Sequence, residues 1–214
     1  MKKLFCSLII ALCTLGMTSA SQAQLKVSEA FIKAPKSVFP LLDDMTKLDM
    51  IDYYNSSLST SSANVLDGKS RITLLQPQKM TIEMTNASTY EIDLLTTASG
   101  DTIITLISTV STPAHDSQLT VYSSDWSANL TDKFFERPSL DDWLTAEGKN
   151  NSGEVEALVP FLLVSYSYNP EERALSLTNN TKDFLSTDIY DIVAAYLKPS
   201  ITYLWNGKKF QPSK

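Results

Sequence analysis

The feature that most constrains the fold is a change of hydrophobic period partway along the chain. Residues 28–58 have helical spacing, and Leu48, Ile51 and Tyr54 fall on one predicted helix face. Residues 71–123 instead alternate apolar and polar side chains. Alternation puts every second side chain on the same face of a strand, so this part predicts an antiparallel meander with a sheet that packs on one side only.

The alternation also predicts which side chains form the buried sheet face. Helices within residues 37–57 are expected to cover that face. The segment Thr102–Val110 is β-branched and almost continuously apolar, which is typical of a central strand. The predicted apolar face consists of Met80, Ile82, Met84, Ile92, Leu94, Ile104 and Leu106.

The C-terminal part repeats this combination. Strands are predicted at 161–168 and 174–178, and Asn206-Gly207 predicts a terminal hairpin. A helix is predicted over 188–197, and Lys149–Gly153 is expected to be a mobile polar segment. The helix face that should pack against these strands contains Ile189, Ile192, Val193 and Tyr196.

Segregated helices and antiparallel strands predict an α+β fold of two tandem units, each with helices packed on a sheet. The first unit is expected to span residues 24–130 and the second residues 131–214.

Residues 1–23 have the pattern of a removable signal peptide. Lys2 and Lys3 precede a short apolar run, and small residues before Gln24 predict cleavage after Ala23. We therefore expect export to the periplasm or the cell surface, with no transmembrane segment after signal removal. Loss of the two lysines changes the formal charge from −6 to −8, and this acidic balance argues against nucleic acid as a partner.

Several short segments together resemble an uncharacterised family of secreted proteins from Bacteroides-type bacteria. The resemblance implies export and a repeated helix-plus-sheet architecture, similar to β-lactamase-inhibitor-like and other small periplasmic binding folds. It implies no reaction. The segments are Ala34-Pro35 with Phe39–Leu42, Leu48–Tyr54, Leu66–Ser70, Asp116-Ser117 with Tyr122 and Asp125-Trp126, and Trp205–Phe210.

No catalytic, cofactor-binding or metal-binding residues are predicted. His115 is the only histidine, and its neighbours Asp116 and Ser117 should point to alternate faces of an extended chain. Both cysteines, Cys6 and Cys13, fall within the predicted signal, so a zinc site of the usual kind is not expected. Paired carboxylates occur at Asp43-Asp44, Asp141-Asp142 and Glu171-Glu172, where helix starts and turns also explain them.

Aromatic residues provide the candidate binding site. Amphipathic rings can contact a protein or stack on sugars, although the same rings can close the edges of a core. The candidates are Trp126, Trp143, Trp205, Tyr53 and Tyr54, accompanied by Tyr166 and Tyr168.

Three functional hypotheses remain open. The first is a non-enzymatic exported binding or protein-interaction module, whose partner is a protein or glycan of the cell envelope. The second is a glycan-acting hydrolase that uses paired carboxylates. The third is a structural component of the cell envelope. Asp101-Thr102-Ile103 also fits a short O-glycosylation pattern at Thr102.

Overall fold

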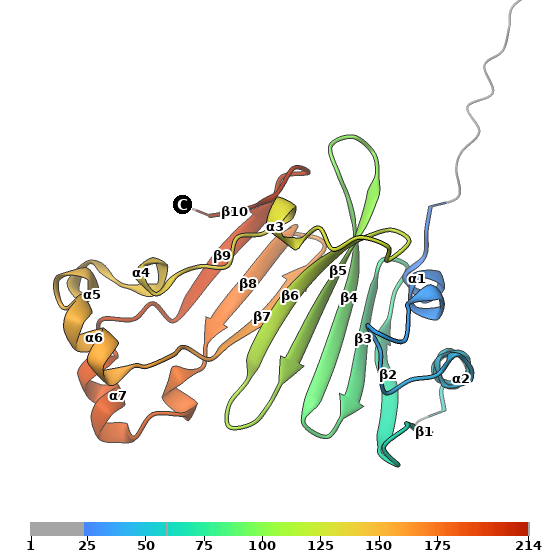
Figure 1. The fold of residues 1–214 in the computed structure, drawn as a ribbon, viewed down its shortest axis with the longest axis horizontal. Helices are drawn as coiled ribbons and strands as arrows, with labels where there is room; N and C mark the ends of the chain where they lie inside the picture. Colours follow the sequence, from blue (N-terminus) through green and yellow to red (C-terminus); the bar gives the residue numbers. More distant parts are fainter. Residues whose placement is uncertain (1–23, 59, 214) are drawn as a thin grey trace, which may run out of the picture.

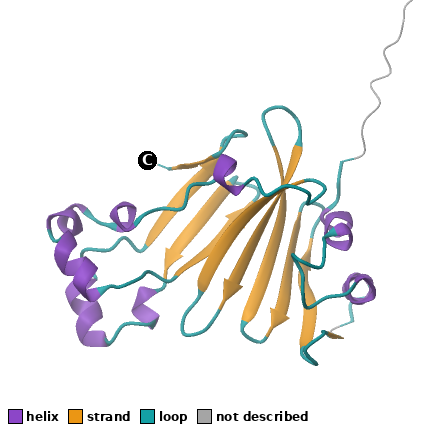
Figure 2. Cartoon of the chain, in the orientation of Figure 1, coloured by secondary structure: helices purple, strands orange, loops and turns teal. Residues whose placement is uncertain are grey.

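The computed structural model describes residues 24–58 and 60–213, so the predicted signal peptide lies outside the described residues. These residues form two antiparallel sheets, of six and four strands, with short helices at both ends (Figure 1). Figure 2 shows most of the helices at the two ends of the molecule, with α3 lying over the strands between them. The predicted α+β class is confirmed.

Two helices precede the first sheet, α1 (Val27–Lys33) and α2 (Asp44–Asn55). Helix α2 begins after Asp43, whose Oδ1 accepts a hydrogen bond from the backbone N–H of Thr46 at 2.7 Å. This is an N-cap, which satisfies one of the free donors at the start of a helix. The predicted helical segment 28–58 is therefore interrupted between residues 33 and 44.

The first sheet is an antiparallel meander whose strands lie side by side in chain order. The central position expected for residues 102–110 is confirmed, since this strand pairs with a neighbour on each side. The strands are β1 (Ser62–Ala63), β2 (Lys69–Leu75), β3 (Lys79–Thr85), β4 (Ser88–Thr96), β5 (Thr102–Val110) and β6 (Asp116–Ser123).

All seven residues of the predicted sheet face are buried in one cluster with residues from α1, α2 and the chain between them. The face that α2 turns inward agrees with the prediction at Ile51 and Tyr54 but differs at Leu48. Lys47, Met50 and Ile51 are buried, whereas the side chain of Leu48 is 41% exposed. Ile51 and Tyr54 of the predicted face do contact the core, so the helix spacing was recognised correctly, but Lys47 and not Leu48 is buried in the turn before them.

The first sheet packs on both faces, so the prediction of one-sided packing is wrong. Leu95, Ile103 and Ile107 point away from the helices and are buried against the second sheet. The sequence contains the physical reason: consecutive apolar residues, such as Ile103 followed by Ile104, place an apolar side chain on each face.

The second sheet has the strand order β10-β9-β8-β7. Its strands are β7 (Val164–Asn169), β8 (Ala174–Asn179), β9 (Ser200–Trp205) and β10 (Phe210–Pro212). The predicted terminal hairpin is confirmed by the pairing of Phe210 with Trp205. Strand β7 lies against β5 and β6, so residues of both sheets contribute to one shared core.

The remaining helices are short and lie between the sheets or at the far end of the second one (Figure 1). They are α3 (Thr131–Phe134), α4 (Leu140–Trp143), α5 (Ala146–Asn150), α6 (Ser152–Leu158), the 3₁₀ helix η1 (Thr181–Asp183) and α7 (Thr187–Val193). No helix among the described residues is long and apolar enough to span a membrane.

Two expectations for this end of the molecule are corrected. Residues 149–153, expected to be a mobile polar segment, belong largely to helices α5 and α6. Val193 of α7 packs with Val155, Leu144 and Leu197 in a separate small core, while Ile192 is exposed. Helix α7 therefore packs against α6 and the chain at Leu144 and Leu197 instead of strands 161–168 and 201–205, because α6 provides an apolar partner that the sequence did not reveal.

Candidate functional site

The three tryptophans predicted as contact residues are core residues. Trp126, Trp143 and Trp205 are 6%, 1% and 3% exposed. The indole N–H of Trp126 donates to the carbonyl oxygen of Ala30 at 2.9 Å, and that of Trp205 donates to Thr96 O at 3.0 Å. Buried indoles whose polar group is already satisfied cannot contact a partner in this conformation. The alternative interpretation, that these rings close the core, describes them.

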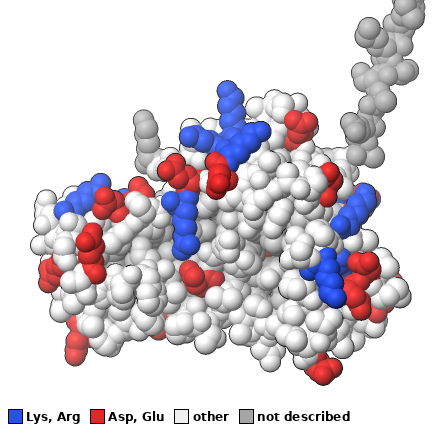
Figure 3. Space-filling model, viewed as in Figure 1, with Lys and Arg blue, Asp and Glu red and all other residues white. Residues whose placement is uncertain are grey.

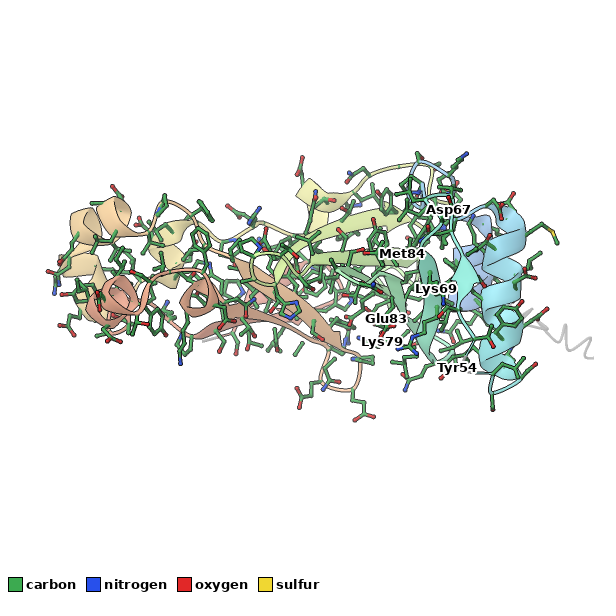
Figure 4. The ribbon with its side chains drawn as sticks, turned by 90° about the horizontal axis from the view of Figure 1, so that it is seen from below. Tyr54, Asp67, Lys69, Lys79, Glu83 and Met84 are labelled. Atoms are coloured by element: carbon green, nitrogen blue, oxygen red, sulfur yellow. The ribbon has the colours of Figure 1, made fainter. Side chains whose placement is uncertain are left out.

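Tyr53 and Tyr54 are the predicted contact residues that keep partial exposure. Tyr54 packs against the first core and lines a hollow of about 520 Å³ with Met50, Ile72 and Arg71. Figure 4 shows Tyr54 on α2, at the opposite end of the molecule from α4–α7. The structure therefore does not bring the five predicted aromatic residues together.

His115, Asp116 and Ser117 do not form a triad. The Nδ1 atom of His115 lies 3.0 Å from the Ser111 hydroxyl oxygen. Asp116 Oδ1 accepts from the backbone N–H of Val164 at 3.1 Å, and the buried Ser117 hydroxyl oxygen accepts from the N–H of Tyr166 at 3.0 Å. Each group is engaged with a different part of the structure, which agrees with the expectation that neighbours on a strand face apart.

The carboxylate pairs lie at helix starts and in a turn. Asp43 caps α2, and Asp44 forms an ion pair with Lys47. The Oδ2 of Asp142 accepts from both the N–H and the hydroxyl of Ser139 in the capping box of α4. Glu171 and Glu172 lie in the turn between β7 and β8. Within residues 24–58 and 60–213 no group of three His, Cys, Asp or Glu residues is arranged to hold a metal ion.

Side chains of the first sheet bind the outer backbone edge of β7. The N–H groups of Val164, Tyr166 and Tyr168 donate to Asp116, Ser117 and Glu91, respectively. An edge strand has unpaired backbone groups that must be satisfied if they are buried. This contact between the two sheets was not predicted, because hydrogen bonds from a side chain to a distant backbone have no sequence signature.

A buried ionic cluster lies at one end of this contact. Lys79 Nζ is 2.8 Å from Glu91 Oε1 and 3.5 Å from Asp93 Oδ1, and it donates to Tyr168 O at 2.6 Å. Figure 4 shows Lys79 near the strands of the second sheet. Burial, together with the charge of Glu91, raises the pKa of Asp93 well above its usual range, although Lys79 opposes this shift.

A polar hollow of about 600 Å³ lies between the 132–142 segment and the β9–β10 hairpin. Its apolar floor is formed by Phe135, Tyr203 and Phe210, all buried. Its rim carries Lys133, Arg137 and Lys209 as well as Asp132, Glu136 and Asp142. Figure 3 shows Lys and Arg gathered at the top of this view, over α3 and the β9–β10 turn, with Asp and Glu close by.

The cations on this rim have no ion pair within the part of the chain that the structure describes. Among the described residues, the cationic side chains that lie within 4.0 Å of a carboxylate are Lys47, Arg71 and Lys79. The hydroxyl of Tyr203, which lines this hollow, and that of Tyr166, which lines a neighbouring one, are held in their neutral form. Burial, followed by the charge of Asp142, raises the pKa of Tyr203 to about 12, and burial also raises that of Tyr166 against the opposing charge of Arg137.

Segment 132–137 lies between two hollows. Asp132, Phe135 and Arg137 also line a second one, of about 480 Å³, against β5 and β6. Sequence reasoning missed both. The signal that could have found them is the pattern Asp-Lys-Phe-Phe-Glu-Arg, in which two buried rings anchor the chain and flanking charges remain in solvent.

Comparisons with known proteins identify relatives without a known activity. The family model described as "Protein of unknown function (DUF3256)" matches residues 18–210. A solved structure described as a domain of an uncharacterized protein from Porphyromonas gingivalis W83 is similar, with a TM-score of 0.76 and 20% sequence identity. The match covers 87% of this chain and 97% of that one. No curated protein sequence matches. At this identity the likeness shows the fold alone, and the β-lactamase-inhibitor-like layout stays a prediction.

Proposed function

Because the chain belongs to DUF3256, a family of proteins of unknown function, we propose a function from the geometry: a non-enzymatic exported binding protein whose ligand site is the hollow beside residues 132–142. Its ligand is a polar component of the cell envelope, a glycan or a protein. The observation that carries this proposal is the set of unpaired cations above a rigid aromatic floor.

The floor is rigid because its rings pack on one another. The ring centroid of Phe135 lies 5.6 Å from that of Tyr203 and 6.2 Å from that of Phe210, both in edge-on arrangements. A pre-organised surface binds with a smaller entropic cost than one that must become ordered. A concave site with a few convergent polar groups is also the usual form of a ligand-binding site.

The rim indicates what kind of ligand fits. Arg137 and Lys209 can donate hydrogen bonds to a ligand, while Glu136 and Asp132 can accept them. A glycan suits such a rim because each of its hydroxyl groups can both donate and accept. We therefore rank a glycan first, and a polar protein segment second.

The hollow also bears on the hydrolase hypothesis, since Glu136 and Asp142 both line it. Asp142 is engaged by Ser139 in a helix cap, at 2.8 Å from both the N–H and the hydroxyl. A carboxylate in that position would have to leave the cap to act as a general acid or base. Binding without turnover therefore accounts for the arrangement with fewer changes than hydrolysis does.

The test is titration of the mature protein with purified envelope glycans and, separately, envelope proteins, followed by amide chemical shifts. Shift changes should cluster on 132–142 and β9–β10. Arg137→Gln and Lys209→Gln should each weaken binding about tenfold, which is about 1.4 kcal/mol, while Lys36→Gln, an exposed lysine elsewhere, should not.

Two results would overturn the proposal. Shift changes confined to another surface would move the site. Release of glycan fragments that Glu136→Gln or Asp142→Asn abolishes would make the protein a hydrolase.

A further inference from the structure

The buried cluster at the sheet junction has more acidic than basic groups. Lys79 on β3 is directly opposite Asp93 on β4 in the strand register, and Glu91 lies two residues away on the same face. One ammonium group therefore faces two carboxyl groups, at 2.8 Å and 3.5 Å. With all three groups charged, the cluster would bury a net negative charge, which is costly in a low-dielectric interior.

Asp93 is the group that the surroundings leave unsatisfied. It is 1% exposed, and neither carboxyl oxygen accepts a hydrogen bond from any described residue. Its cross-strand neighbour on β5, Thr105, donates to the backbone oxygen of Asp93 and not to its carboxylate. Glu91, in contrast, accepts a hydrogen bond from the N–H of Tyr168 and forms an ion pair with Lys79.

The other ionisable groups facing the cluster do not neutralise it. Tyr168 on β7 is held neutral, because burial and then the charge of Asp93 raise its pKa to about 12. Arg173, in the turn between β7 and β8, is exposed. Its charge opposes the rise in the pKa of Tyr168, and it forms no ion pair with Asp93. Lys79 is therefore the cation available to both carboxyl groups.

This cluster also holds one residue of β7 at both of its backbone groups. The N–H of Tyr168 donates to Glu91 Oε1 at 2.8 Å, and Tyr168 O accepts from Lys79 Nζ at 2.6 Å. The Lys79–Glu91 ion pair thus binds both backbone groups of Tyr168 at the edge of the second sheet. Any change that draws Lys79 away from Glu91 weakens the attachment of β7.

We propose that Asp93 holds a proton in the folded protein, and that loss of this proton to solvent at higher pH loosens β7 from the first sheet. With the proton present, the charges of Lys79 and the two acids sum to zero, and both backbone contacts of Tyr168 are intact. Without it, Asp93 competes with Glu91 and Tyr168 O for the same ammonium group. The attachment of β7 to the first sheet is then weaker at high pH than at low pH.

The direction of the effect on stability follows from linkage. A carboxyl group whose pKa is raised by folding contributes its stability fully below its unfolded pKa, and this contribution is lost as the pH rises to the folded pKa. In that interval one such group costs about 3–5 °C of melting temperature per pH unit in a protein of this size.

The test compares melting temperatures of the mature protein and Asp93→Asn from pH 4 to pH 9. The variant keeps the shape of the side chain but cannot ionise. We expect similar values near pH 4 and a lead for Asp93→Asn that grows as the pH rises. Glu91→Gln should also remove the dependence, because one remaining carboxylate then balances Lys79. The exposed Asp49→Asn is the matched control and should follow the wild type at every pH.

A second measurement reports on the attachment of β7 to the first sheet. Hydrogen exchange at the Tyr168 amide, corrected for the intrinsic effect of pH, should accelerate as the pH rises in the wild type but not in Asp93→Asn. Carboxyl carbon shifts of Asp93 in the wild-type protein cover the case in which a variant does not fold. Parallel melting curves for wild type and Asp93→Asn, or an Asp93 carboxyl that titrates near its ordinary value, would overturn the proposal.

Discussion

The indole nitrogen of Trp126 donates a hydrogen bond to the carbonyl oxygen of Ala30 at 2.9 Å, across 96 positions of sequence. It ties the loop after β6 to helix α1 at the edge of the first core. The backbone of Trp126 has φ 64°, in the left-handed region that non-glycine residues rarely adopt. The ring and its hydrogen bond thus hold a turn that the residue would not favour by itself.

Replacing Trp126 should therefore destabilise the first core. Trp126→Phe removes the donor, leaves Ala30 O without its partner and opens space beside Phe39, so we expect a loss of about 1–3 kcal/mol in the free energy of unfolding. Urea denaturation followed by fluorescence or circular dichroism measures this loss. Phe184→Leu, which changes an exposed ring, is the control and should stay within about 0.5 kcal/mol of the wild type. Equal stability of both variants would contradict the assigned role.

Lys47 connects α2 to the end of α1 from a buried position. Its Nζ donates to Ala34 O at 2.7 Å and lies 3.1 Å from Asp44 Oδ1. Lys47→Met keeps the apolar stem but leaves Ala34 O without a donor, so we expect about 1–3 kcal/mol of destabilisation in a urea titration. Lys36→Met removes an exposed lysine nearby and should cost far less. If Lys47→Met were as stable as that control, the ammonium group would have no role in holding the helices.

Asp125 gives a dependence on pH opposite in sign to that of Asp93. Hydrogen bonds from the hydroxyls of Ser123 and then Ser127, with the Ser127 N–H, lower the pKa of Asp125 from 3.8 to about 2. A lowered pKa means that the stabilisation is present above the unfolded value and is lost as the pH falls through about 2. We expect Asp125→Asn to melt below the wild type at pH 6 and to match it at pH 2. A difference that persists unchanged at pH 2 would show that charge is not the cause.

The first sheet was predictable because its information is local. Alternation from Met80 to Leu106 identified the buried face, since a strand fixes the direction of every side chain. The second face was not recognised, because Leu95 and Ile107 are buried by strands far away in the sequence. The same holds for α7: its spacing predicted an apolar side but not which element covers Val193.

The candidate sites show the same limit more strongly. Tryptophan suits both a contact surface and a core, and the sequence carries no sign that Trp143 and Trp205 point inward. The unpaired charges of Arg137 and Lys209 become visible only once segment 132–137 is placed beside β9–β10. The Lys79–Asp93 pairing depends on strand register, and a shift of the register by one residue would abolish the pairing.

Cleavage after Ala23 remains a prediction that the fold allows. Small residues at Ser21 and Ala23 suit signal peptidase, and helix α1 does not begin until Val27, so residues 24–26 separate the predicted cleavage site from the first helix. A protease needs an accessible, extended chain, and residues 24–26 are not part of helix α1. We expect intact-mass analysis of the exported protein to give a chain that starts at Gln24. Ala23→Arg, which puts a large side chain next to the cleaved bond, should leave the precursor uncut, whereas Lys26→Arg should be processed normally. A mature protein that keeps residues 1–23, or carries a lipid on Cys13, would show that the segment is an anchor.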